Sequence, residues 1–412
     1  MDRSGIKQLS RLSHVTSLNM LRLHPVIFGL VVAAFYAVAM FPGLRRAQYD
    51  PSVFIVAGDR FVDRQRLDSP IIVRNHSDGY DGEFYYRLAI DPWPAADGSH
   101  GVTPDSAAAR GQRILYPLIV WTVSFGNAKL VPAALVLVNL VAVGVAAAAA
   151  TGLARAASLS RWVPFAIALW PGFTITVTHD TTELVPQAFV LLALWAFAVD
   201  RLWLFALLAG VAPLAREVNL LLPASFFLWS TAAALRQRSP ASFRLVIACA
   251  LAMAPCLVWR ETLAIALQSP VAASSDIGWP GLGWLQTVER IVAGIAGRPA
   301  ALAVLGVAAV TSAGFVVLVA SHLPTAVRHR SIAPVTLAWS SLAILMALLT
   351  AGGPWTDAVA IFRAFTECFV LGIVVLGMAR TDRRVAVPLL CVLAALWLLI
   401  WRVALGHIVP LQ

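Results

Sequence analysis

Apolar segments long enough to cross a lipid bilayer recur along almost the whole chain. A transmembrane helix needs about 20 mostly apolar residues, and many apolar runs approach that length. The pattern therefore predicts an all-α polytopic membrane protein with eleven transmembrane helices. The predicted spans cover residues 25–42, 129–154, 162–178, 184–200, 202–214, 217–235, 245–266, 299–321, 333–351, 357–379 and 385–405.

One long polar stretch, residues 43–112, follows the first span and is rich in proline, glycine and aspartate. The next apolar piece, residues 114–126, would rise only about 20 Å as a helix, which is too short to cross the bilayer. We therefore expect it to lie in or dip into the membrane interface. The predicted parts are a cytoplasmic tail (1–24), a first span (25–42), an extracytoplasmic loop with interfacial helices (43–126) and a multi-span domain (127–412).

The distribution of arginine sets the expected orientation. The chain has 412 residues, is 59% hydrophobic and 13% charged, and carries a net charge of +10. Arginines recur in the short loops between alternate spans, which is the positive-inside pattern, so the net charge does not indicate nucleic-acid binding. The N-terminus is then cytoplasmic, and the 43–112 loop and the C-terminus are extracytoplasmic. Because arginine almost replaces lysine and alanine is abundant, we expect the cytoplasmic (inner) membrane of a bacterium.

The loop contains a motif rich in carboxylates and aromatic side chains, from Asp78 to Arg87. Apolar positions at helical spacing predict an amphipathic helix from Gly82 to about Ile90, lying at the membrane surface with its aromatic rings in the headgroup region. Asp81 and Asp78 are the candidate catalytic bases, although Asp81 could also be only the N-cap of this helix. Tyr80, Glu83, Tyr85 and Arg87 are candidate substrate-binding residues, and the rings of Tyr80, Tyr85, Tyr86 and Trp93 could stack on a sugar.

A second polar group, from His179 to Glu183, separates two predicted spans on the same side of the membrane. We expect Asp180 and Glu183 to contact substrate. The alternative is a solvated loop in which Asp180 or Thr181 caps the next helix. His179, Asp180 and Glu183 could also hold a hard cation, but three ligands without a fourth indicate a metal only weakly. The sequence therefore predicts no metal site and no cofactor.

Ionisable residues inside predicted spans are expensive to bury in lipid and often mark function. Arg216 and Glu217 interrupt one apolar run and are followed by Asn219, while Arg363 and Glu367 lie one helical turn apart in a later span. The arginines should lie toward the outer leaflet, where they would hold a lipid-linked phosphate if they face a water-filled cleft. The alternative is internal ion pairing, for which Arg363 and Glu367 have the i,i+4 spacing.

These residues place groups that accept a proton above groups that hold a phosphate. The chemistry that uses both is glycosyl transfer from a polyprenyl-phosphate sugar. In that reaction a carboxylate removes the proton of the acceptor hydroxyl while the phosphate leaves the anomeric carbon. The expected partners are a polyprenyl-phosphate-linked sugar, a glycan or lipid acceptor and membrane lipid, with no nucleic acid.

The order of elements also resembles a known superfamily, the GT-C glycosyltransferases, which have a tail, one span, a large outer loop with an acidic motif, interfacial helices and many further spans. The run from Tyr80 to Tyr85 (Tyr-Asp-Gly-Glu-Phe-Tyr) resembles the aromatic-Asp-Gly-x-aromatic-Tyr pattern of phosphatidylinositol-glycan-type mannosyltransferases and of bacterial relatives linked to surface glycopolymers. Residues 113–118 (Arg-Ile-Leu-Tyr-Pro-Leu) are similar to the segment after that loop. Residues 214–219 (Leu-Ala-Arg-Glu-Val-Asn) resemble the arginine–asparagine motif.

The resemblance implies an inverting transferase of a hexosyl or pentosyl group, with Asp81 as the base and Arg113, Arg216 and Asn219 in the site. The chain departs from the family pattern because it has no adjacent Asp–Glu pair at the end of the first span and no large soluble C-terminal domain, which leaves the sugar and acceptor open. Two other functions fit the same features. One is a polymerase, ligase or flippase-like transporter of lipid-linked glycans, and the other is a non-catalytic membrane subunit of a polysaccharide assembly.

Overall fold

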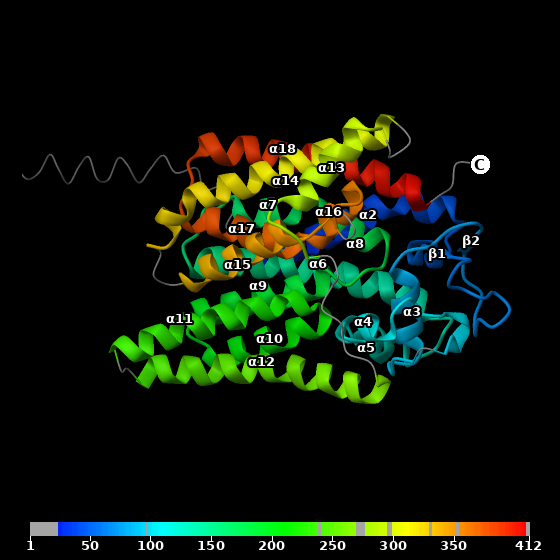
Figure 1. The fold of residues 1–412 in the computed structure, drawn as a ribbon, viewed down its shortest axis with the longest axis horizontal. Coiled ribbons are helices and arrows are strands. Elements are labelled where there is room, and N and C mark those ends of the chain that lie inside the picture. Colours follow the sequence, from blue (N-terminus) through cyan, green and yellow to red (C-terminus); the bar gives the residue numbers. More distant parts are fainter. Residues whose placement is uncertain are drawn as a thin grey trace, which may run out of the picture.

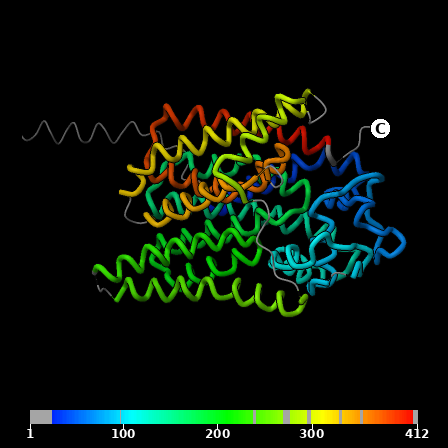
Figure 2. The backbone as a smooth tube through the Cα atoms, in the orientation of Figure 1, coloured from blue at the N-terminus to red at the C-terminus, as the bar shows by residue number. Residues whose placement is uncertain are grey.

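The fold consists almost entirely of α-helices. The computed structural model describes residues 24–95, 97–237, 240–268, 277–294, 299–328, 332–350 and 354–408, so nearly all of the predicted cytoplasmic tail lies outside the described residues. Long helices run side by side along one axis of the molecule, and the chain between residues 51 and 124 gathers at one end of them (Figures 1 and 2). We call this region the polar end.

Among the described residues, six helices are long and apolar enough to cross a membrane, and a bent pair makes a seventh if it forms one span. These helices indicate an integral membrane protein, as the hydrophobic pattern predicts. Several begin at a proline, because the first turn of a helix loses no hydrogen bond there. The six are α2 (Pro25–Arg46), α6 (Val131–Ala156), α11 (Leu221–Gln237) with the preceding η3 (Glu217–Leu220), α12 (Pro240–Leu267), α14 (Pro299–Ala326) and α18 (Arg383–Ile408), and the bent pair is α16 (Ala358–Ala364) with α17 (Thr366–Met378).

The other predicted spans coincide with shorter helices. Helices of 14 or 15 residues rise about 21–23 Å, which is less than the ~30 Å hydrocarbon core of a bilayer. The count of eleven spans therefore stays a prediction. The shorter helices are α7 (Val163–Ala168), α8 (Pro171–Thr178), α9 (Leu184–Ala198), α10 (Leu202–Ala215) and α15 (Pro334–Leu348), and α13 (Leu282–Val292) lies outside every predicted span.

Two of the predicted spans are broken in the middle. Trp170 has an extended backbone (φ −65°, ψ 121°) between α7 and α8, because Pro171 disfavours the helical conformation at the residue before it. The axes of α16 and α17 meet at Phe365 with an angle of 58°. The two breaks lie against each other, since the indole of Trp170 donates to the hydroxyl of Thr366 at 3.2 Å. Broken helices leave backbone polar groups that need partners inside the protein.

The polar end contains the predicted loop helix α3, which has the expected bounds, Gly82–Ile90, and runs across the direction of the long helices (Figure 1). Two strands beside it pair in parallel over two residues each, Ala57 with Val73 and Gly58 with Arg74. The elements of this end are η1 (Pro51–Ile55), β1 (Ala57–Gly58), β2 (Val73–Arg74), α3 (Gly82–Ile90), η2 (Ser99–Gly101), α4 (Ala107–Gly111) and α5 (Leu115–Ser124).

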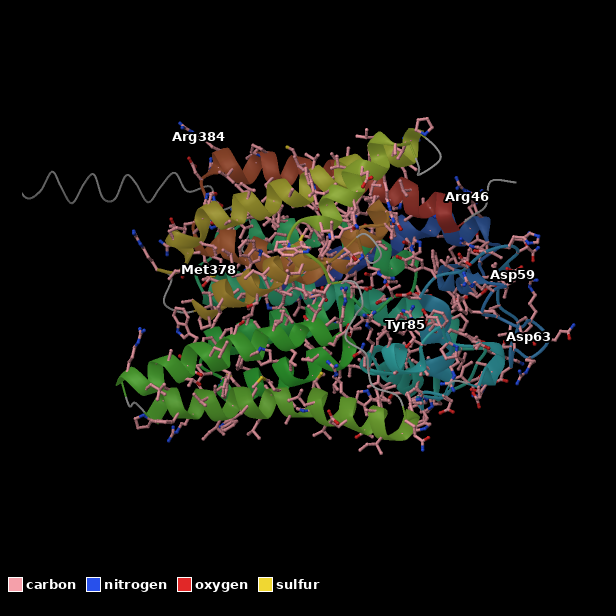
Figure 3. All side chains as sticks on the ribbon, in the orientation of Figure 1. Arg46, Asp59, Asp63, Tyr85, Met378 and Arg384 are labelled. Atoms are coloured by element: carbon pink, nitrogen blue, oxygen red, sulfur yellow. The ribbon has the colours of Figure 1, made fainter. Side chains whose placement is uncertain are left out.

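The predicted anchoring of the α3 side chains among lipid headgroups is wrong, because all nine residues of the helix are buried. The ring of Tyr85 packs edge-on against that of Tyr116, with 5.8 Å between centroids, and lies inside the polar end (Figure 3). Glycine allows this close packing. A Cβ at Gly82 would lie 2.5 Å from the carbonyl oxygen of Ile55 and 2.6 Å from that of His179. The aromatic rings of α3 are therefore anchored in protein, not among lipid headgroups.

The two ends of the helices differ in the residues that they carry. Met378 and Arg384 lie at the end opposite to Asp59 and Asp63 (Figure 3). We expect cysteines introduced at position 97 and at position 328 to react with a membrane-impermeant maleimide from opposite sides of sealed vesicles, because the arginine-rich loops should face the cytoplasm. Labelling of both positions from the same side would contradict this orientation.

Candidate functional site

Asp81 immediately precedes α3, but its side chain makes no capping hydrogen bond. Its backbone is helical, whereas an N-cap residue usually has an extended backbone. The carboxylate instead forms ion pairs with Arg110 at 2.9 Å and with Arg363 at 2.7 Å. The interpretation of Asp81 as only a helix cap is therefore wrong.

Arg110 reaches Asp81 from α4. Its Nε and Nη2 donate to both carboxylate oxygens of Asp105, at 2.8 and 2.7 Å. The guanidinium also lies over the ring of Phe84, 4.6 Å from its centroid, which is a favourable cation–π geometry. Arg110 is therefore held in place by the protein, and its remaining nitrogen, Nη1, is the one that pairs with Asp81.

The bend between α16 and α17 positions two more arginines. Because α16 ends at Ala364, the carbonyl groups of its last residues have no backbone N–H donor within the helix. Arg216 donates to these carbonyl groups, from Nη1 to that of Arg363 at 3.1 Å and from Nη2 to that of Ala364 at 3.0 Å. Nη1 also pairs with Glu367 at 2.9 Å. The i,i+4 pair of Arg363 with Glu367, the alternative to phosphate binding, is replaced by this contact, because the helix bends at Phe365 between them.

Glu183 joins these two arginines. Its Oε1 lies 3.3 Å from Nε of Arg363 and 3.8 Å from Nη1 of Arg216. The ring of Tyr80 lies beside Arg363, with its centroid 4.9 Å from the guanidinium carbon. Arg216, which lies between two predicted spans, and Arg363, which lies within another, thus share one buried carboxylate.

Arg113 completes the group from the segment between α4 and α5. It forms a two-point ion pair with Glu217, at 3.0 and 2.9 Å, and Tyr85 lies beside it. Asn219 donates to Glu367 at 3.3 Å. We call the charged set the arginine–carboxylate cluster. Its members are Asp81, Arg110, Arg113, Glu183, Arg216, Glu217, Arg363 and Glu367.

The cluster has a partly open side and a closed side. The side chains of Asp81 and Arg363 are 14% and 16% exposed, whereas that of Glu183 is 1% exposed. Both terminal nitrogens of Arg216 donate to protein acceptors. In contrast, Nη1 of Arg363 is buried, and no described residue accepts a hydrogen bond from it. Arg363 is therefore the arginine with hydrogen-bonding capacity left for a ligand, and Asp81 is the carboxylate beside it.

The surrounding charges decide the protonation state of Asp81. Burial disfavours its ionisation, but Arg363, Arg110 and Arg113 outweigh burial and hold the pKa of Asp81 well below its usual range. Asp81 is then ionised at neutral pH but is a weak base, because the same arginines stabilise the carboxylate against protonation. A general base works best when its pKa lies near the working pH. A ligand that drew Arg363 away from Asp81 would raise the pKa of the carboxylate and make it a stronger base.

Two predicted site residues lie away from the cluster. Asp78, the second candidate base, has a side chain that is 77% exposed and pairs with Arg60 at 2.8 Å. Arg87 is buried and donates to the carbonyl oxygen of Trp93 at 2.6 Å and to the hydroxyl of Ser99 at 2.7 Å. Asp78 thus forms a surface ion pair, and Arg87 stabilises the segment that follows α3 through these two hydrogen bonds.

Glu83 is buried and accepts a hydrogen bond from the backbone N–H of Gly58 at 2.8 Å. Burial raises the pKa of Glu83 to about 8, because the hydrogen bond from Gly58 and the charge of Arg110 offset only part of the loss of hydration and of the repulsion by Asp81. Glu83 is therefore largely protonated at neutral pH. It supports the contact between β1 and α3.

This protonation predicts the effect of Glu83→Gln on stability. The folded-state pKa lies above the ordinary value of 4.5, so the stability that neutral Glu83 contributes is full below about pH 4.5 and is lost as pH rises through about 8. Gln cannot ionise, and it can still accept from Gly58. We expect the variant to match wild type near pH 5 and to be more stable near pH 9, by at most about 4 kcal/mol at roughly 1.4 kcal/mol per pKa unit. Thermal unfolding at both pH values tests this. The same difference in unfolding midpoint between the two proteins at pH 5 and at pH 9 would contradict a neutral Glu83.

Asp180 lies in the connection between α8 and α9, where Thr181, Thr182 and Glu183 are also buried. The interpretation of this segment as a solvated loop is therefore wrong. Burial raises the pKa of Asp180 well above its usual range, and the amide of Asn139 within hydrogen-bonding reach offsets only part of this effect.

Among the described residues, no group of three or more His, Cys, Asp or Glu side chains is arranged to hold a metal ion.

Sequence reasoning missed Arg110 as a site residue and assigned Glu367 only to Arg363. One signal could have found Arg110. Arg110 precedes the predicted site residue Arg113 by three residues, a spacing that places both on one face of a helical segment. Both arginines pair with carboxylates of the cluster.

The cluster combines two chemical capacities. Asp81 can accept a proton once an arginine is drawn away, and Arg363 can bind an anion through its fork of N–H groups. The chain matches no protein-family model, and no curated protein or solved structure matches it either. Its function must therefore be inferred from these capacities and from the membrane-crossing helices around them.

Proposed function

We propose that this protein is a membrane glycosyltransferase that moves a sugar from a polyprenyl-phosphate donor to a glycan or lipid acceptor. The contact of Asp81 with Arg363, at 2.7 Å on the partly open side of the cluster, carries this proposal. One group would accept a proton from the acceptor and the other would hold the phosphate of the donor, so the two side chains together could act on a bound donor–acceptor pair. The apolar helices around the cluster provide a surface for the long isoprenoid chain of such a donor.

In the proposed reaction, the donor phosphate binds Arg363. Asp81 takes the proton of the acceptor hydroxyl, the acceptor oxygen forms a bond to the anomeric carbon, and the bond from that carbon to the phosphate oxygen breaks. The electron pair leaves with the polyprenyl phosphate, whose charge Arg363 stabilises. Attack on the face opposite the phosphate inverts the anomeric configuration.

The ion pair between Asp81 and Arg363 then has a role in timing. The donor phosphate competes with Asp81 for Arg363, so that donor binding loosens the carboxylate from one of its arginines and raises its pKa. Asp81 becomes a useful base only when the donor is in place. Arg216 is a positioning residue in this scheme, because it binds the carbonyl groups at the end of α16 from which Arg363 projects.

The proposed location of the reaction is the extracytoplasmic side of a bacterial cytoplasmic membrane. The cluster joins the polar end to the helix breaks, whereas Arg384 lies at the opposite end of the bundle (Figure 3). Because arginine-rich loops stay in the cytoplasm, the cluster should face outward. This location fits an acceptor that belongs to the cell envelope.

A transfer assay tests the proposal. Purified protein in lipid nanodiscs is given short-chain polyprenyl phosphates that carry radiolabelled glucose, mannose or arabinose, together with a cell-envelope lipid and glycan extract. We expect the label to move to an acceptor while free polyprenyl phosphate appears in equal amount. Movement of an intact donor between leaflets of a vesicle without bond cleavage would instead indicate a transporter. Neither movement nor transfer would indicate a non-catalytic subunit.

A further inference from the structure

Behind the cluster lies a second group of polar side chains, all fully buried. Gln187 follows Glu183 by four residues, which places both on the same side of α9. Helix α6, which carries Asn139, packs along α9, and Asn139 lies within hydrogen-bonding reach of Asp180. We call this group the buried polar layer. Its members are Asn139, Asp180, Thr181, Thr182 and Gln187.

The buried polar layer has unused hydrogen-bonding capacity. The following atoms have no well-formed hydrogen bond with any described residue: Oδ1 of Asn139, both carboxylate oxygens of Asp180, the hydroxyls of Thr181 and Thr182, and both polar atoms of the Gln187 amide. Buried polar atoms without partners destabilise a folded protein, and native proteins contain few of them. Their concentration in one layer is therefore unexpected for a purely structural core.

The layer directly adjoins the cluster. Thr182 immediately precedes Glu183, whose carboxylate pairs with Arg363 at 3.3 Å. On the other side, the carbonyl oxygen of His179 is in close contact with Gly82, the residue after Asp81. The layer is therefore joined to the cluster through Glu183 on one side and through the segment next to Asp81 on the other.

The chemistry of the layer selects the kind of ligand. Its side chains offer both donors and acceptors, and none of them carries a positive charge. A phosphate would find no cation there and would be repelled by Asp180 if that carboxyl were ionised. An uncharged group with several hydroxyls, which both donate and accept, would satisfy the amide, hydroxyl and carboxyl groups together.

We propose that the buried polar layer binds the hydroxyl groups of the sugar that the donor carries. This inference rests on the proposed function and deepens it, because it assigns sugar recognition to residues other than those that hold the phosphate and accept the proton. Asn139, Thr182 and Gln187 then determine which sugar is accepted. A layer built for hydrogen bonding discriminates strongly against a sugar that leaves its groups unpaired.

Two variants test the proposal, Thr182→Val and Gln187→Met, because each removes polar atoms at nearly constant volume. The full chain in nanodiscs is heated with a bare short-chain polyprenyl phosphate or with the same lipid carrying glucose, mannose or arabinose. For wild type, we expect one sugar-bearing lipid to raise the unfolding midpoint by several degrees more than the bare lipid does. Both variants should have an equal or higher midpoint without ligand, keep the shift caused by the bare lipid, and lose most of the additional shift.

A matched control is Thr151→Val, because Thr151 is also buried but donates its hydroxyl to the carbonyl oxygen of Ala147 at 2.9 Å. It lies twelve residues beyond Asn139 on α6, which is about 18 Å. This control should retain the additional shift. An additional shift that persists in both Thr182→Val and Gln187→Met would overturn the proposal, as would a wild type on which no sugar-bearing lipid acts more strongly than the bare lipid.

Failure of the proposed function would look different. In that case the bare polyprenyl phosphate would not raise the unfolding midpoint of wild type. Arg363→Lys would then not change the difference between the midpoints measured with and without lipid. If the bare lipid stabilises wild type and Arg363→Lys abolishes this shift, the phosphate site stands, and the sugar shift then decides the role of the layer alone.

Discussion

Asp81→Asn should lower the rate of glycosyl transfer by about 100-fold or more, which is the usual scale for losing a general base. Asn keeps the size of the side chain and can accept a hydrogen bond from Arg110, but it cannot take the acceptor proton. The change also removes the shared counter-ion of Arg110 and Arg363. We therefore expect a loss of stability as well, of up to about 3 kcal/mol for a partly buried pair. The measurement is the turnover number of purified protein, taken well below the unfolding midpoint of the variant.

Two control variants separate loss of the base from loss of a charge. Glu217→Gln removes one negative charge from the same cluster, where the Glu217 side chain is 29% exposed and pairs with Arg113. It should lose stability to a similar degree and keep most of its activity. Asp78→Asn should change little, because exposed ion pairs contribute little to stability. A folded Asp81→Asn protein that transfers sugar at the wild-type rate would rule out Asp81 as the base.

The pH dependence of the reaction gives a second result for Asp81. Activity requires the ionised carboxylate, so it should be lost as pH falls through the pKa of Asp81. In the free protein, the neighbouring arginines hold that pKa well below its usual range. The pH profile of kcat/KM reports the free protein, and that of kcat reports the bound state. If the donor phosphate draws Arg363 away, the acid limb of kcat should lie at higher pH than that of kcat/KM. Coincident limbs would show that donor binding leaves the pair intact.

Arg363→Lys should raise the KM for the donor and lower kcat/KM by about 10- to 100-fold. Lysine keeps the positive charge but replaces a planar fork of N–H donors with a single ammonium group. A lost hydrogen bond to a charged partner costs about 1.5–3 kcal/mol, and about 1.4 kcal/mol corresponds to a tenfold change. Steady-state kinetics with varied donor at saturating acceptor measure the effect.

Arg216→Lys is the matched comparison for Arg363→Lys. The terminal nitrogens of Arg216 bind the carbonyl groups of Arg363 and Ala364 and the carboxylate of Glu367. Lysine cannot reproduce this set of contacts, so we expect a larger drop in the unfolding midpoint than for Arg363→Lys. Its effect on the donor KM should be the smaller of the two. The opposite ranking, with Arg216→Lys stable but weak in donor binding, would exchange the roles of the two arginines.

The hydrophobic pattern alone determined that the chain is helical and that it carries helices able to cross a membrane. The reason is local, because a segment in lipid must be apolar and must satisfy its own backbone hydrogen bonds. The bounds of α3 followed in the same way from the spacing of Phe84, Tyr85 and Leu88. The sequence alone also identified Asp81, Arg216 and Arg363 as charged residues that need a counter-ion.

Only the tertiary structure decided which groups meet. Periodicity reports that a helix has an apolar face, but not whether its other face meets water or protein, so the complete burial of α3 could not be read from it. The partners of Asp81 come from α4 and α16, which are remote in sequence, and no local rule connects them. The bend at Phe365 separates Arg363 from Glu367 and gives each a different partner. These contacts depend on long-range packing, because a buried charge pairs with whichever opposite charge the fold brings within a few ångströms.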